Sequence, residues 1–154
     1  MMFSLGSDHR GAQAISRVAD KLKSDGHDIF LMTGHTGKPC DYPEAAYLVA
    51  KSVSDGQADL GILICGTGIG MSIAANKTDG VRAAVVHDEL TAQISREHNN
   101  ANVLCLSADL LGERRIEKIV EAWIGASFDG GRHDRRIRKI AAIEQGRNPQ
   151  EIGE

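Results

Sequence analysis

The stretch Leu60-Gly61-Ile62-Leu63-Ile64-Cys65-Gly66-Thr67-Gly68-Ile69-Gly70 decides the fold class. Its first six residues are almost all apolar, which is typical of a central parallel strand covered by helices on both faces. The alternating glycines that follow allow a tight turn, in which several backbone N–H groups can point at one anion where a helix begins. The stretch therefore predicts a buried strand, an oxyanion or phosphate loop, and a helix from residue 69. A tight turn without a ligand is the alternative.

Strand and helix patterns alternate on both sides of this stretch. Short apolar runs predict four further strands, at residues 2–7, 28–32, 81–86 and 102–106. Apolar residues at helical spacing predict helices at residues 11–24, 43–53, 69–76, 88–98, 110–127 and 132–144. This alternation favours an α/β fold, a Rossmann-like three-layer sandwich with a five-stranded parallel sheet and helices on both faces.

The length of 154 residues leaves room for one compact domain, which we place at residues 1–144. Residues 145–154 contain two glycines and a proline and show no apolar periodicity. We expect them to form a C-terminal tail that is mobile or contacts a partner.

Composition excludes several classes of protein. The chain is 42% hydrophobic and 25% charged, as in ordinary soluble domains, and no apolar run approaches the length of a membrane span. We expect neither secretion nor membrane insertion. The net charge of -3 argues against nucleic-acid binding. The three cysteines form no CxxC pair and are odd in number, which indicates free thiols in a reducing compartment, the cytoplasm.

Candidate chemistry gathers at the carboxyl ends of the predicted strands, where sheets of this kind bind ligands. Asp8, His9 and Cys65 lie at such ends. The amides of the glycine loop could stabilise a Cys65 thiolate, although a free cysteine is equally often an apolar core residue. A dinucleotide loop would need a glycine at position 71, which is Met71, and no Gly-Lys-Ser/Thr of a P-loop occurs.

A second set of candidates lies elsewhere in the fold. His98 ends the helix before the last strand, which places it at the amino edge of the sheet, the wrong edge for Cys65 of the same chain. It is either a helix C-terminal histidine favoured by the macrodipole or part of a neighbouring subunit's site. Arg132 and Arg136 share one helical face and could grip a phosphate, or they belong to a solvated basic face. No metal-binding spacing occurs, so a metal is not expected.

Taken together and in order, the motifs of the chain resemble ribose-5-phosphate isomerase type B. The resemblance runs from about residue 5 to residue 144. It is carried by Gly6-Ser7-Asp8-His9-Arg10-Gly11, Asp41-Tyr42-Pro43, the segment from Gly61 to Gly70, Ala74-Ala75-Asn76-Lys77, Ser95-Arg96-Glu97-His98-Asn99-Asn100 and Gly130-Gly131-Arg132-His133. The wider family includes galactose-6-phosphate isomerase subunits, allose-6-phosphate isomerases and tetrulose-phosphate isomerases.

The resemblance implies an aldose–ketose isomerase that interconverts ribose 5-phosphate and ribulose 5-phosphate without a cofactor. Cys65 would be the base that moves a proton between C2 and C1, and Thr67 would hold a substrate hydroxyl or the thiolate. His98 would open the furanose ring. The enediolate would be stabilised by the backbone amides of the loop, which come from Gly66, Gly68, Ile69 and Gly70.

The resemblance also implies how the sugar phosphate is held. His9 would join the two arginines around the phosphate, Asp8 and Tyr42 would touch sugar oxygens, and Asn76 would buttress the glycine loop. The family's active site lies between two subunits, so we expect an obligate homodimer, able to pair into a tetramer. The partner would supply His98, Asn99, Arg132 and Arg136.

One position departs from the family. Many members carry a phosphate-contacting arginine in the loop after the fifth strand, where this chain has Ser107-Ala108-Asp109. Asp109 would repel phosphate if it pointed inward. An isomerase of another sugar phosphate, acting on allose or galactose 6-phosphate or on a tetrose phosphate, is therefore an alternative. A non-catalytic phosphate or nucleotide-binding module is a second, and a thiol redox protein built on Cys65 a weaker third, since no resolving cysteine lies near.

Overall fold

A computed structural model describes residues 1–33 and 38–153. Residues 34–37, between the second predicted strand and the helix that follows it, lie outside these residues, and so does residue 154 of the predicted tail. Five parallel strands form one sheet in the order β2-β1-β3-β5-β4. The strands are β1 (Met2–Ser7), β2 (Asp28–Thr33), β3 (Leu60–Cys65), β4 (Ala83–Val85) and β5 (Val103–Ser107).

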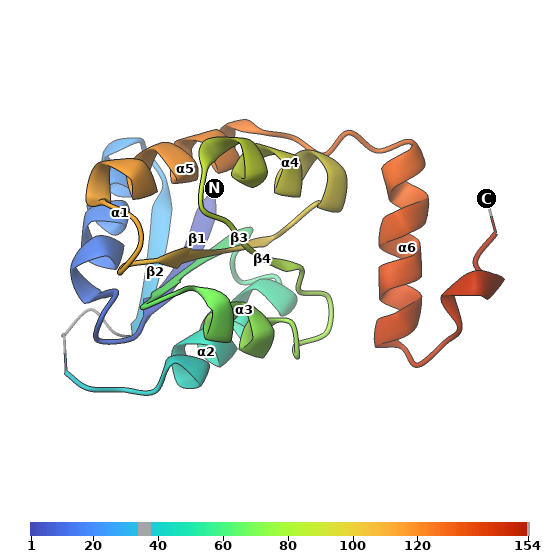
Figure 1. Cartoon of the computed structure of the whole chain (residues 1–154), viewed down its shortest axis with the longest axis horizontal. Coiled ribbons are helices and arrows are strands. Elements are labelled where there is room, and N and C mark those ends of the chain that lie inside the picture. The colour runs from blue at the N-terminus through green and yellow to red at the C-terminus, as the bar shows by residue number, and fades with distance from the viewer. Residues whose placement is uncertain (34–37, 154) are drawn as a thin grey trace.

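Helices cover both faces of this sheet, as Figure 1 shows, with α1, α4 and α5 on one side and α2 and α3 on the other. The helices are α1 (Ala12–Ser24), α2 (Tyr42–Ser54), α3 (Ile69–Ala75), α4 (Glu89–Asn99), α5 (Glu113–Gly125) and α6 (Arg132–Glu144). Each face has its own apolar core, one around Trp123 and Phe3 and the other around Val49 and Met71. The three-layer α/β prediction is confirmed, and β3 is buried along its whole length.

Two predicted elements are shorter than expected. The strand predicted at residues 81–86 is reduced to Ala83–Val85 because Val81 ends a turn, its N–H bonding the carbonyl of Thr78. The helix predicted at residues 110–127 begins only at Glu113, since Gly112 before it has an extended backbone. Both differences arise at loops, where apolar residues such as Val81 and Leu111 are buried although they lie outside a strand or helix.

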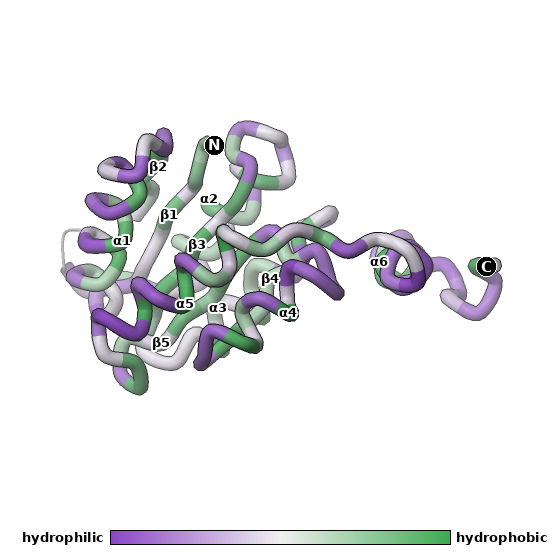
Figure 2. The backbone as a smooth tube through the Cα atoms, turned by 90° about the horizontal axis from the view of Figure 1, so that it is seen from above, coloured by the Kyte–Doolittle hydropathy of each residue, from purple (hydrophilic) through white to green (hydrophobic). Residues whose placement is uncertain are grey.

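The last helix stands apart from the three layers. After α5 the chain runs out through residues 126–131, and α6 projects from the body in both views (Figures 1 and 2). It contacts the body at two places: His133 stacks on His98 of α4, with ring centroids 4.3 Å apart, and Glu144 Oε1 accepts from the Gly80 N–H at 2.9 Å. Ile143 on α6 is 61% exposed. The tail that follows contains one turn of 3-10 helix, Pro149–Glu151.

No helix within the described residues is both long and apolar enough to span a bilayer.

Gly11 fixes how closely α1 approaches the central strand. A Cβ at this position would lie 2.3 Å from the carbonyl oxygen of Ile64, an atom of the sheet backbone that cannot move aside. We therefore expect Gly11→Ala to lower the free energy of unfolding by about 2–3 kcal/mol, measured by urea titration. Gly125→Ala is the matched control, because nothing lies within 4 Å of its added Cβ. A Gly11→Ala protein as stable as wild type would contradict this packing.

Candidate active site

The turn after β3 brings a backbone amide to the sulfur of Cys65. The Gly68 N–H donates to Cys65 Sγ over 3.1 Å, and Cys65 is only 4% exposed. Gly68 adopts a left-handed backbone with φ of 78°, and a Cβ there would lie 3.1 Å from the carbonyl of Leu106. Glycine is therefore required for the turn, and the turn places an N–H donor at the Cys65 sulfur. Helix α3 begins at Ile69, as predicted.

Two further predicted residues lie at the same turn. The Ile69 N–H donates to Thr67 Oγ1 over 3.3 Å, so the exposed Thr67 hydroxyl keeps its own proton free to donate. Tyr42, the first residue of α2, lies against Gly70: a Cβ at Gly70 would sit 2.5 Å from the tyrosine ring. The fold thus brings a partly exposed phenol from α2 to the start of α3.

Asp8 and His9 follow β1, the strand next to β3. Ser7 pairs with Ile64, so the end of β1 lies beside the end of β3. The buried Asp8 carboxylate accepts from the N–H groups of Arg10 at 2.9 Å and Gly11 at 3.1 Å. It therefore closes the turn between β1 and α1, a structural task that its residue type and position already suggest. His9 is exposed beside it.

Asp109 does not stand as an unpaired charge at this edge. Arg10 Nε donates to its two carboxylate oxygens at 3.0 and 2.9 Å, and Arg10 Nη2 lies 2.8 Å from Oδ1. The hydrogen bond to Asp109 raises the pKa of the Arg10 guanidinium above its usual value. Sequence reasoning missed Arg10, and the one available signal was its place directly after Asp8 and His9.

The remaining predicted residues form a second group at the opposite edge of the sheet. Val103, which opens β5 after α4, pairs with Gly61, four residues before Cys65. That separation amounts to about 13 Å of parallel strand. One group of predicted residues therefore comprises Asp8, His9, Tyr42, Cys65, Gly66, Thr67, Gly68, Ile69 and Gly70 at the carboxyl edge. The other comprises His98, Asn99, Arg132 and Arg136 on α4 and α6.

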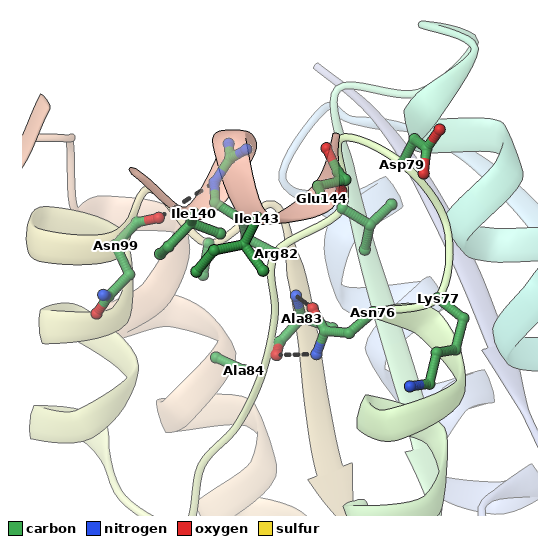
Figure 3. Close-up of a pocket in the computed structure, with 12 residues that line it drawn as sticks. Asn76, Lys77, Asp79, Arg82, Ala83, Ala84, Asn99, Ile140, Ile143 and Glu144 are labelled. Carbon is green, nitrogen blue, oxygen red and sulfur yellow. Dashed lines mark hydrogen bonds between the residues drawn. The ribbon is translucent and has the colours of Figure 1, made fainter. Parts of the chain in front are cut away.

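A cavity of about 600 Å³ lies between α6 and the β4 side of the body (Figure 3). Ile140 and Ile143 of α6 line it, with Asn99 at its border. The Asn76 side chain also borders it, and donates to the Ala83 carbonyl and accepts from the Ala83 N–H, both at 2.9 Å. Asn76 thus fastens β4 to α3. The expectation that it buttresses the glycine loop is wrong, because its side chain binds Ala83 instead.

His98, His133 and Asp129 lie together, their potential ligand atoms all within 4.8 Å of one another. The two imidazole rings are stacked with only 10° between their planes. Because a metal binds a histidine nitrogen in the plane of its ring, two parallel rings cannot direct their lone pairs at one ion. The stack instead holds the two rings face to face, with His133 Nε2 accepting from Arg132 Nε at 3.4 Å.

The surroundings of His133 disfavour its protonated form. Burial lowers its pKa, and the nearby charges of His98, Arg132 and Arg136 lower it further, against a smaller opposing effect of Asp129. The unfolded chain, with an ordinary histidine pKa of about 6.5, takes up this proton before the folded chain does. Stability contributed by neutral His133 is thus present above that pH and is lost as the pH falls.

We therefore expect the melting temperature to decrease when the pH is lowered from 7.5 to 5.5. The decrease should be smaller in His133→Gln, because this variant lacks the proton uptake at position 133. Calorimetric melting at a series of pH values measures the difference. His27→Gln, a half-buried histidine at the other end of the molecule, is the control and should keep the wild-type slope. Identical slopes in wild type and His133→Gln would show that His133 is not the group responsible.

The chain is similar to known proteins over most of its length. The family described as Ribose/Galactose Isomerase matches residues 3–140. Ribose-5-phosphate isomerase B of Escherichia coli (strain K12) is 43% identical over 145 residues, which cover 94% of this chain and 97% of that protein.

Two solved structures share the fold over almost their full length. Clostridium thermocellum ribose-5-phosphate isomerase B has a TM-score of 0.93 at 44% identity, covering 95% of this chain and 99% of that one. The Mycoplasma genitalium ribose-5-phosphate isomerase B with bound ribulose-5-phosphate has a TM-score of 0.87 at 42% identity, covering 94% and 96%. The chain belongs to the ribose/galactose isomerase family.

Proposed function

We propose that this chain interconverts ribose 5-phosphate and ribulose 5-phosphate, with Cys65 as the base. The observation that carries the proposal is the Gly68 N–H donating to Cys65 Sγ at the carboxyl end of β3, beside Tyr42. The names of the Escherichia coli and Clostridium thermocellum relatives, and the ribulose-5-phosphate bound to the Mycoplasma genitalium one, support this substrate.

The reaction follows from these groups. The Cys65 thiolate removes the proton from C2 of the open-chain aldose, and the electron pair forms the C1–C2 double bond as the C1 carbonyl becomes an oxyanion. In this proposal, N–H groups of the turn from Gly66 to Gly70 stabilise that charge as it develops. Cys65 then returns the proton to C1, while the hydroxyl proton on O2 passes to O1 and the C2 carbonyl forms. Base and donors lie within one turn, as this chemistry needs.

We further propose that the active site is shared by two copies of the chain. His98, which would open the sugar ring, and the phosphate-binding Arg132 and Arg136 would come from the second copy, because within one chain they lie at the edge opposite Cys65. Exposed apolar side chains on α3 and α6 support an interface: Ile69 and Ile73 are 52% and 59% exposed, and Ile143 is 61% exposed. Such patches are typical of association surfaces.

The remaining expectations fit this proposal. In it, residues 1–144 form one domain per copy, and the dimer requires neither cofactor nor metal and does not bind nucleic acid. The tail from residue 145 is free to contact a partner or a second dimer, which would give a tetramer. Three free cysteines, Cys40, Cys65 and Cys105, support a place in the reducing cytoplasm.

The test is product formation from ribose 5-phosphate and from galactose, allose and erythrose phosphates, with no metal added. We expect ribose 5-phosphate to be converted, and Cys65→Ala to lower kcat by at least about 10³-fold because the proton transfer then lacks its base. Cys40→Ala, which removes a thiol outside the turn, is the control and should keep wild-type activity. Preference for a six- or four-carbon sugar phosphate would mean that the chain is an isomerase of the same family with a different substrate. Full activity of Cys65→Ala would contradict the proposed base.

A further inference from the structure

The pair of Arg10 and Asp109 lies directly against the glycine loop. Arg10 stands between β1 and α1, Asp109 between β5 and α5, and Gly66 between them on the loop after β3. A Cβ at Gly66 would lie 2.9 Å from Asp109 Oδ2 and 3.3 Å from Arg10 Nε. The Asp109 N–H also donates to the Gly66 carbonyl over 3.1 Å. The guanidinium is therefore positioned beside the loop that would hold the reacting sugar.

The way the pair is made leaves half of the guanidinium unused. A guanidinium offers two hydrogen-bonding edges, Nε with one terminal nitrogen and the two terminal nitrogens together. Asp109 takes the first edge, with contacts of 2.8 to 3.0 Å from Nε and Nη2. Within residues 1–33 and 38–153 the Arg10 guanidinium has no other partner, and the side chain is 56% exposed. The second edge, formed by Nη1 and Nη2, is therefore left to donate to a bidentate oxyanion.

Asp109 makes the free edge of the Arg10 guanidinium better suited to bind an anion. Its carboxylate holds the guanidinium in one orientation, so binding a second anion orders less of the flexible side chain. Stability gives little reason for such an arrangement, because exposed ion pairs contribute only about 0–1 kcal/mol. His9, which is exposed and directly precedes Arg10 in the sequence, offers a second donor at this end of the sheet.

We propose that Arg10, oriented by Asp109, binds the phosphate of the substrate through its free edge and is a specificity residue for phosphorylated sugars. This inference rests on the proposed function, since it assigns a substrate contact to that same site. Asp109, which the sequence marks as a charge that would oppose phosphate, is then the residue that orients the cation binding it.

The first measurement is the dissociation constant for inorganic phosphate by calorimetry, which needs no turnover, together with KM and kcat for ribose 5-phosphate. We expect Arg10→Ala to raise both the phosphate dissociation constant and KM by about tenfold or more, the effect of one lost charge-assisted contact. The kcat should change by less than about threefold, because the contact is made equally before and during the reaction. Arg17→Ala is the matched control.

Arg17 resembles Arg10 in its ion pairing but differs in its position. Arg17 of α1 makes comparable exposed ion pairs with Glu113 and Glu117 of α5, away from the glycine loop. Its loss should leave phosphate binding and KM unchanged. If Arg17→Ala and Arg10→Ala weaken phosphate binding equally, the effect is a general loss of positive charge and the assignment to Arg10 is overturned.

A double variant distinguishes the loss of a phosphate contact from repulsion of phosphate by an unpaired Asp109 carboxylate. Arg10→Ala leaves that carboxylate unpaired and able to repel phosphate, whereas Arg10→Ala/Asp109→Asn removes both charges. If Arg10 binds phosphate, the double variant keeps the raised dissociation constant and KM. If both values return to those of wild type, or if Arg10→Ala alone changes neither, the proposal is wrong. A wild-type protein that binds phosphate but converts no sugar would count against the proposed function and leave the Arg10 assignment standing.

Discussion

The parallel pairing of β3 with β1 on one side and β5 on the other is the constraint on which the site depends. In this register Ser7 lies beside Ile64 and Cys65 beside Ser107. The three loops that follow these strands therefore leave the sheet at one edge and next to one another. A shift of one residue would turn every side chain of β3, including Cys65, to the opposite face. Asp8, Cys65 and Asp109 owe their proximity to this register.

The same constraint separates the two groups of candidate residues. In a parallel sheet each helix returns the chain to the amino edge, so His98 at the end of α4 necessarily lies away from Cys65. Helix α6 does not resolve the separation, because its contacts with the body, His133 on His98 and Glu144 with Gly80, involve residues that precede β5 and β4. A site that uses both Cys65 and His98 therefore needs a second copy of the chain. The projecting helix, with apolar residues uncovered, is the element best placed to reach it.

The sequence predicted the parts that depend on local pattern. The apolar run and glycines of residues 60–70 indicated the central strand and the turn, and the helix at 132–144 was located to the residue. Position along the chain alone indicated that His98 lies at the wrong edge. It did not reveal the Arg10–Asp109 pair, because the two residues are 99 positions apart and meet only through strand order. The contact of Tyr42 with Gly70 and the stacking of His133 likewise depend on packing between distant elements.

If one active site combines Cys65 of one copy with His98 of another, two variants that are each inactive should complement one another. Two inactive variants, Cys65→Ala and His98→Ala, can be produced together with different affinity tags and the mixed dimer purified by both tags. A symmetric dimer has two equivalent sites, so the mixed dimer has one site with both groups intact and one with neither. We predict about half of the wild-type activity on ribose 5-phosphate. A purified mixed dimer as inactive as its parents would show that the site does not form between copies.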